Sequence, residues 1–352
     1  MNSIACRLLL ALSLAALLPQ HAWARKPKPR DTLVADNTAG TYATRQDVRD
    51  FAEQLAERRQ LPAEWVQAQL AQARLQPAAQ RLMMPPPAGA AKNWAAYRDR
   101  FVEPQRIAAG MRFWQEQADW LERAQAEYGV PAHIVVGIVG VETFYGRITG
   151  NFRVLDALAT LAFDFPSGRS DRSAFFRSEL EEFLVRCQRE GLDPAVPKGS
   201  FAGAMGLPQF MPSSLNKWAV DFDGDGRIDL DNSGADVVGS VARYLAAHGW
   251  QRDMPPFYAV APPVDTSNRA TLLQPDILPS FSAEQMVALG AGLDDEGRAH
   301  AGPLALVELQ NGNAAPSFVA GTQNFYAITR YNQSSYYAMA VIALGEAVKA
   351  RR

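Results

Sequence analysis

Glu142 is the residue of this sequence best placed for acid–base chemistry. It follows a run from Ala132 to Val141 that holds no charged residue and is apolar on every face, which predicts a buried helix. Pro131 suits the first turn of that helix, and Gly146 would end it. Burial and the negative end of the helix dipole should both raise the pKa of Glu142, as a general acid requires. The simpler interpretation is an exposed glutamate paired with Arg147.

The acidic residues after position 220 have the spacing of a calcium-binding loop. Oxygen-bearing side chains alternate along residues 221–229, with glycine where the chain must turn sharply. The twelfth position is Asn232 instead of the usual glutamate, so the last ligand is assigned to Asp236, with Asp231 as the second choice. The predicted ligands are Asp221, Asp223, Asp225, the carbonyl of Arg227 and Asp236. The ion would be structural and would hold the start of the next helix. A solvated acidic turn is the alternative.

Two further stretches have the composition of a sugar-binding groove. Residues 198–214 combine several small residues with Gln209, which offers a donor and an acceptor, and with the apolar side chains of Phe201, Phe210 and Met211. Residues 324–341 form a polar corner rich in tyrosine. Polar groups suit sugar hydroxyl and amide groups, and apolar surface suits the sugar rings. The first stretch could equally be a tight structural turn, and the tyrosines could simply pack in a core.

Composition and the N-terminal segment indicate an exported globular protein. The 352 residues are 48% hydrophobic and 20% charged, with a net charge of −2, so nothing favours a nucleic-acid partner. Residues 1–24 read as a signal peptide, with an apolar stretch and the cleavage site Ala22-Trp23-Ala24. An uncleaved anchor is the alternative. Cleavage would leave Cys187 alone, which excludes an intramolecular disulfide, and no later apolar run is long enough to span a membrane.

The remaining chain must position these residues, and its patterns predict mostly helices. After a flexible leader (25–44), the predicted helices cover residues 46–59, 62–75, 94–128 with a break at Pro104, 154–163, 173–190, 237–247, 283–289 and 335–349. Short strands are predicted at residues 257–261, 304–309 and 317–320, with a hairpin turn at Asn311-Gly312 and a strand-like run near Asn324. The predicted division is a helical domain (45–129), a catalytic core (130–250), a β-containing insert (251–320) and a returning C-terminal segment (321–352).

Together these stretches resemble the lytic murein transglycosylase B family of bacteria. The matching motifs are Gly-Val-Glu-Thr-x-x-Gly around Glu142, Gly-Ser-Phe-Ala-Gly-Ala-Met-Gly-x-x-Gln-Phe-Met-Pro-Ser-Ser and Ile-Thr-Arg-Tyr-Asn-x-Ser-x-x-Tyr-Ala-Met-Ala-Val, in the family's order. The resemblance implies an α+β, mostly α fold: a lysozyme-like core, an N-terminal helical domain, an EF-hand-like calcium loop and a small β insert. It also implies cleavage of the β-1,4 bond between N-acetylmuramic acid and N-acetylglucosamine, with 1,6-anhydro ends.

The resemblance assigns roles residue by residue. Glu142 takes the catalytic position, and the positions matched to the glycan groove are Ser200, Gln209, Tyr331, Tyr337 and Arg172; the loop before Arg172 differs from the family in length. The same calcium ligands, ending in Asp236, carry over. Leu207-Pro208 replaces the family's Tyr-Gly, which changes subsite contacts but not the chemistry.

The residues indicate one well-placed acid, whereas a hydrolytic glycosidase generally needs two carboxylates. One acid fits a transglycosylase in which Glu142 acts as acid and then as base, with no cofactor. Peptidoglycan strands in the periplasm are the expected partner, together with cell-wall synthesis or turnover proteins. The alternatives are a lysozyme-type hydrolase with Asp164 as second carboxylate, and a non-catalytic glycan-binding scaffold.

Overall fold

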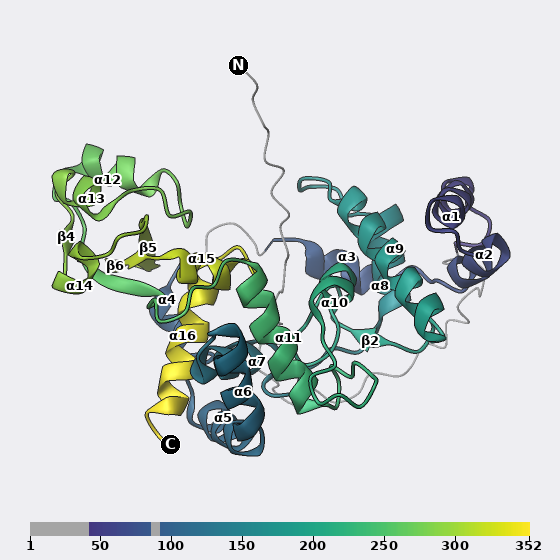
Figure 1. Cartoon of the computed structure of the whole chain (residues 1–352). Coiled ribbons are helices and arrows are strands. Elements are labelled where there is room, and N and C mark those ends of the chain that lie inside the picture. The colour runs from purple at the N-terminus through teal and green to yellow at the C-terminus, as the bar shows by residue number, and fades with distance from the viewer. Residues whose placement is uncertain (1–41, 86–91) are drawn as a thin grey trace, which may run out of the picture.

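The computed structural model describes residues 42–85 and 92–352 (Figure 1). The predicted signal peptide and most of the predicted leader lie outside the described residues. The end of that leader belongs to the fold, because Tyr42 is 2% exposed and its hydroxyl donates to Asp164 Oδ2 at 2.7 Å. The leader therefore ends earlier than residue 44.

The described part of the chain is mostly helical. Its first helices are α1 (Gln46–Arg59), α2 (Ala63–Ala71), α3 (Pro77–Met83), α4 (Trp94–Arg98), α5 (Pro104–Glu116), α6 (Ala118–Tyr128), α7 (Ala132–Thr143) and α8 (Val154–Phe163). The later ones are α9 (Ser173–Glu190), α10 (Pro212–Trp218), α11 (Gly234–Ala247), α12 (Thr266–Leu273), α13 (Ala283–Ala288), α14 (Asp295–Arg298), α15 (Gln323–Thr329) and α16 (Ser335–Lys349). The predicted bounds of α1, α8, α9 and α16 are confirmed.

Two sequence predictions about helices were wrong. The run near Asn324 is helix α15 and not a strand. The Thr322 side chain accepts a hydrogen bond from the Asn324 N–H and caps that helix, while Phe325 and Ile328 lie buried on one face. The helix predicted over residues 62–75 ends at Ala71.

The α7 helix lies at the centre of the body and packs most extensively on α16 (Figure 1). A Cβ atom at Gly137 would collide with the carbonyl oxygen of Val341, so the glycine allows the two helices to approach closely, as expected. The segment predicted as one helical domain lies in two places. Helices α1 to α3 pack with α8 and α9 at one end of the molecule, whereas α4 to α6 pack on α7 and α16.

The β insert forms a four-stranded antiparallel sheet with a core of its own. Its strands are β3 (Phe257–Ala261), β4 (Gly292–Leu293), β5 (Ala305–Asn311) and β6 (Ala314–Gly321), in the order β4-β3-β6-β5. The predicted hairpin turn is confirmed, with Gly312 at φ +64°. Buried Asn324 ties the insert to the body, because its Nδ2 donates to the carbonyls of Gln251 and Met254 at 2.7 Å each. A second, two-stranded pairing joins β1 (Phe152–Arg153) and β2 (Lys198–Gly199).

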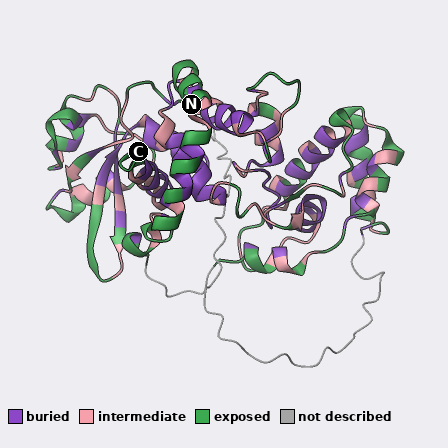
Figure 2. Ribbon diagram, turned by 90° about the horizontal axis from the view of Figure 1, so that it is seen from below, coloured by how far each residue is buried: buried purple, intermediate pink, exposed green. Residues whose placement is uncertain are grey.

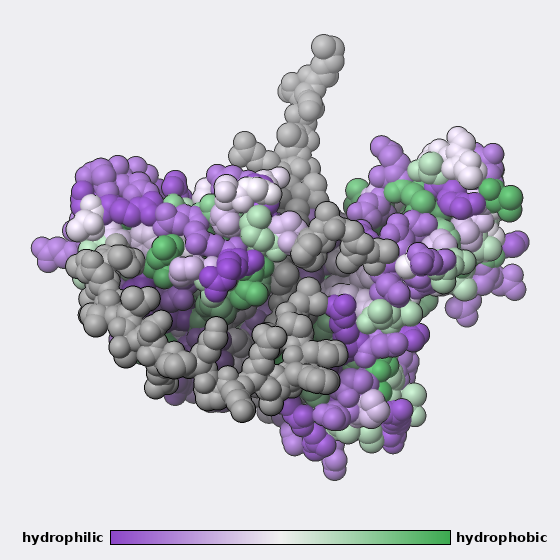
Figure 3. All heavy atoms as spheres, turned by 180° about the vertical axis from the view of Figure 1, so that it is seen from behind, coloured by the Kyte–Doolittle hydropathy of each residue, from purple (hydrophilic) through white to green (hydrophobic). Residues whose placement is uncertain are grey.

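Buried residues run through the helices of the body, with exposed residues on the outer faces (Figure 2). On the face shown in Figure 3, hydrophobic residues occur in small groups among hydrophilic ones. Within residues 42–85 and 92–352, no helix is both long and apolar enough to cross a membrane.

Candidate active site

Glu142 lies in the last turn of α7 and is 8% exposed, so it has not emerged into solvent. The helix ends earlier than Gly146, because Phe144 and Tyr145 both adopt left-handed conformations, with φ of +53° and +55°. Such angles are uncommon outside glycine and mark a strained turn directly after the acid. The guanidinium of Arg147 lies 4.7 Å from the centre of the Phe144 ring.

Tyr337 is a hydrogen-bond partner of Glu142. Its hydroxyl, carried by α16, donates to Glu142 Oε1 at 2.5 Å, and its side chain is fully buried. Burial, reinforced by the Glu142 charge, raises the pKa of Tyr337 well above its usual value, so the phenol stays neutral and remains a donor. Tyr337 therefore holds the acid in place, and in this structure it does not present a face to an open groove.

Other aromatic residues form a shell around this pair. Tyr331 is 4% exposed and lies 6.5 Å from Tyr337 in a stacked arrangement. Tyr244 packs on Tyr331 at 4.5 Å. Phe210 was predicted to offer apolar surface to a sugar, but in this structure it lies inside the aromatic shell. Its ring is only 2% exposed and packs on Tyr244 and Tyr331 at 5.4 and 5.8 Å, so it supports the shell from behind.

Tyr97 packs against Tyr336, the residue before Tyr337, and sequence analysis missed it. Burial, followed by the charge of Glu142, raises the pKa of Tyr97 to about 12. It is half-buried and packs edge-on against Tyr336 at 5.9 Å. Tyr336 in turn exchanges hydrogen bonds with the backbone of Gln310 in β5. In the sequence, Tyr97 lies in an ordinary helical stretch. Its position is apparent only from its contact with Tyr336, which is far away along the chain.

The loop with Ser200 and Gln209 is a tight turn built on its own side chains. Ser200 Oγ accepts hydrogen bonds from the N–H groups of Ala202 and Ala204 at 3.2 and 3.0 Å. Gln209 has φ +50°, and its Nε2 donates to the carbonyls of Thr149 and Gly206. Both side chains are half-buried. The loop is therefore a tight turn, and both residues lie at the surface of that turn, where a contact with a sugar stays a prediction.

Arg172 and Asp164 lie in other clusters. The Arg172 guanidinium sits over the rings of Phe175 and Phe176, at 4.5 and 5.7 Å, at the start of α9. Burial lowers the pKa of Arg172 from its usual value. Both Asp164 oxygens accept from Arg45 Nη1 at 2.7 Å, and Oδ2 also accepts from Tyr42. These bonds give Asp164 a structural role at the start of the fold.

The acidic loop brings three of its predicted ligands together. Carboxylate oxygens of Asp221, Asp223 and Asp236 all lie within 4.8 Å of one another. Asp236 is 1% exposed, and its oxygens accept from the N–H groups of Phe222 and Asp229 at 2.7 and 2.8 Å. Burial, and then the charges of Asp223 and Asp221, raise the pKa of Asp236.

The donor set fits a hard divalent cation, since three carboxylates face one another and one of them is buried. Asp236, the first choice for the last ligand, is in the cluster, whereas Asp231 is exposed and outside it. Asp225, although predicted as a ligand, is also outside the cluster: its Oδ1 accepts from the N–H of Arg227 at 2.8 Å.

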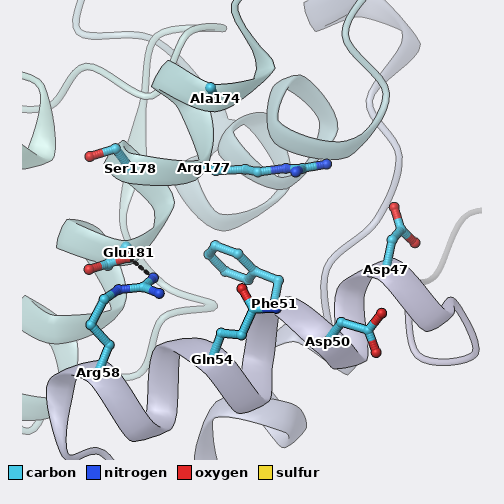
Figure 4. A pocket seen from close by; sticks show the side chains of 9 residues that line it. All are labelled: Asp47, Asp50, Phe51, Gln54, Arg58, Ala174, Arg177, Ser178 and Glu181. Carbon is cyan, nitrogen blue, oxygen red and sulfur yellow. Dashed lines mark hydrogen bonds and ion pairs between the residues drawn. The ribbon is translucent and has the colours of Figure 1, made fainter.

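A separate cavity of about 450 Å³ lies between α1 and α9 (Figure 4). Arg58 and Glu181 form an ion pair at its edge, and Phe51 and Arg177 line its wall. None of the predicted site residues lines this cavity, so it is distinct from the cluster around Glu142.

A buried acid at the end of an apolar helix, in a helical body with a small sheet, defines a lysozyme-like enzyme that cleaves glycans. Residues 43–346 match the family model described as the transglycosylase SLT domain, and the chain belongs to this family. It is 38% identical over 358 residues to membrane-bound lytic murein transglycosylase B of Escherichia coli (strain K12), an alignment that covers 94% of this chain and 95% of the relative.

Solved structures of similar proteins show the same fold. The catenated lytic transglycosylase SltB1 from Pseudomonas aeruginosa superposes with a TM-score of 0.80 at 38% identity, covering 88% of this chain and 99% of that one. The Escherichia coli lytic transglycosylase Slt35 in complex with calcium superposes with a TM-score of 0.75 at 37% identity, covering 90% and 98%. The expected mostly helical, lysozyme-like fold and family are thus confirmed.

Proposed function

We propose that this protein is a lytic transglycosylase that cleaves the β-1,4 bond between N-acetylmuramic acid and N-acetylglucosamine in peptidoglycan. Glu142 is the catalytic acid and base. The observation that carries this proposal is the buried Glu142 carboxyl, fixed by the hydroxyl of Tyr337 at 2.5 Å. Sequence similarity to lytic murein transglycosylases over nearly the whole chain supports the proposal.

The proposed reaction uses one carboxyl twice. Glu142 gives its proton to the glycosidic oxygen, and the bond between that oxygen and C1 of the muramic residue breaks. The N-acetyl oxygen of the same sugar stabilises the cationic C1. The Glu142 carboxylate then takes the proton of the C6 hydroxyl, and the C6 oxygen bonds to C1. The product is a 1,6-anhydro end, water is not consumed, no cofactor takes part, and Glu142 is again protonated.

Around this acid, the remaining predicted residues have supporting roles in the proposal. Ser200, Gln209 and Arg172 bind the glycan from half-buried positions. Tyr331 and Tyr337 lie behind the reacting centre and hold its shape, because both are nearly or fully buried. Tyr97, which is half-buried, is added to the groove residues.

Mass spectrometry of the soluble products from purified peptidoglycan tests the reaction. We expect muropeptides lighter by one water than lysozyme products, ending in anhydro-muramic acid. Reducing-end products would show hydrolysis instead. Binding without any release would support the non-catalytic scaffold.

Asp164→Asn separates the transglycosylase from the hydrolase with Asp164 as second carboxylate. We expect anhydro products at nearly the wild-type rate, because Asp164 is engaged with Arg45 and Tyr42. The thermal midpoint should fall, since this carboxylate joins α1 to α8. Loss of turnover in a folded Asp164→Asn variant would argue for the hydrolase.

We further propose that the acidic loop holds a structural calcium ion through Asp221, Asp223 and Asp236, with Asp225 and the Arg227 carbonyl adjusting to complete the set. The facing carboxylates support this proposal, and the similar Slt35 was solved in complex with calcium. The ion would offset the repulsion among these groups and hold the start of α11.

Chelation of calcium should lower the thermal midpoint. An ion present at 100 times its dissociation constant stabilises the folded state by about 2.7 kcal/mol, equivalent to several degrees. Differential scanning fluorimetry with a chelator and with added calcium measures this shift. Asp223→Asn should abolish it, whereas the control Asp231→Asn, outside the cluster, should keep it. An unchanged midpoint in wild type would refute the calcium proposal and leave the catalytic one untouched.

We also infer that the protein is exported, with cleavage near Ala24, and acts in the periplasm. The composition of residues 1–24 supports export, and peptidoglycan lies outside the cytoplasmic membrane. Proteins of cell-wall synthesis or turnover would be its protein partners.

A further inference from the structure

Thr143, the residue directly after Glu142, joins two segments through one buried hydroxyl group. The side chain is 0% exposed. Its Oγ1 donates to the carbonyl of Leu207 at 2.9 Å and accepts from the N–H of Gly146 at 3.2 Å. A threonine hydroxyl has one donor and two acceptor sites, so both contacts can form together.

The first of these segments is the strained turn that ends α7. Phe144 and Tyr145 both have positive φ, and left-handed conformations are unfavourable for residues other than glycine. Such strain persists only where the surroundings determine the conformation. The N–H of Ile148 donates to the Thr143 carbonyl at 2.9 Å, so the carbonyl and the hydroxyl of Thr143 both close the turn.

The second segment is the loop that carries Ser200 and Gln209. Leu207 receives the Thr143 hydrogen bond on its carbonyl and donates its own N–H to the Leu230 carbonyl at 2.8 Å. Leu230 lies in the acidic loop. The side chain of Leu207 also faces Gly146, where an added Cβ would be in ordinary van der Waals contact with it. Leu207 thus connects the catalytic turn, the proposed groove loop and the acidic loop.

We propose that Thr143 is a positioning residue for Glu142. Its hydroxyl fixes the distance between the end of α7 and the 199–210 loop, and so fixes the acid relative to the glycan held by that loop. This inference rests on the proposed function. The sequence shows that Thr143 follows Glu142, but it does not show the hydrogen-bond partner of Thr143. That partner, Leu207, lies 64 residues further along the chain.

Thr143→Val tests the proposal, because valine keeps the shape and removes the hydroxyl. With soluble glycan strands as substrate, we expect kcat to fall about tenfold with little change in KM, since displacement of a catalytic group slows the chemical step more than it weakens binding. Thr143→Ser, which restores the hydroxyl, should recover most of kcat. If Thr143→Val does not fold, Thr143→Ala is measured in its place, with the same expected loss.

Thr160→Val is the matched control. Thr160 is also 0% exposed, and its Oγ1 accepts from the N–H of Gln76 at 2.9 Å, on α8. It should lose comparable thermal stability and keep its kcat. Wild-type kcat in a folded Thr143→Val variant, or no recovery in Thr143→Ser, would overturn the positioning role. Neither result would affect the proposed function, which depends on the separate outcome of Glu142→Gln.

Discussion

Glu142→Gln should abolish the release of anhydro-muropeptides. Glutamine has nearly the same shape but can neither give the glycosidic oxygen a proton nor take one from the C6 hydroxyl. Loss of a general acid–base costs on the order of 10²–10⁴ in rate, and here the same group serves both steps. Turnover of purified peptidoglycan, followed by chromatography of the released muropeptides, measures the effect.

Glu179→Gln is the control for this substitution. Glu179 is also a buried carboxyl group, and burial raises its pKa, but its oxygens accept from the N–H and hydroxyl of Ser213. We expect this variant to lose stability and to keep its turnover. Both variants should still co-sediment with peptidoglycan. Substantial turnover by Glu142→Gln would mean that another group is the acid and would refute the proposed mechanism.

The sequence predicted the helix that ends at Glu142 because its signal is local. An uninterrupted apolar run, a proline at its start and two glycines for close packing required no knowledge of distant residues, and α7 was found where expected. The turn after it was not predictable in this way. Phe144 and Tyr145 are ordinary residues in the sequence, and their left-handed conformations are held by tertiary contacts such as the Phe113–Tyr145 ring pair, with 5.4 Å between centroids.

The direction in which an aromatic ring points was also beyond the sequence. Phe210, Tyr331 and Tyr337 all have apolar rings. From the sequence, each ring could line a groove or pack in the core. The structure buries all three and leaves Tyr97 half-exposed. The acidic loop shows the same limit: alternation along the chain indicated Asp225, but only Asp221, Asp223 and Asp236 converge.

Tyr337→Phe should reduce kcat roughly 10- to 100-fold with folding intact. The substitution keeps the buried ring and removes only the hydroxyl that donates to Glu142 Oε1 from 195 residues away. A hydrogen bond to a charged group contributes about 1.5–3 kcal/mol, and each 1.4 kcal/mol is about tenfold in rate. The effect falls on the chemical step, because this bond orients the carboxyl group and stabilises the carboxylate that forms when Glu142 protonates the glycosidic oxygen.

Tyr42→Phe is the control that shows whether the fall in kcat of Tyr337→Phe is specific to the hydrogen bond with Glu142. Tyr42 is likewise buried and donates to a carboxylate, Asp164, at 2.7 Å, so its phenylalanine variant loses the same kind of bond at a distance from the proposed chemistry. We expect Tyr42→Phe to lower the thermal midpoint and to keep kcat.

The double variant Tyr337→Phe/Glu142→Gln should be no slower than Glu142→Gln alone, because the tyrosine acts through the glutamate. Additive losses would show that Tyr337 contacts the substrate independently, and wild-type kcat in Tyr337→Phe would show that burial alone positions the acid.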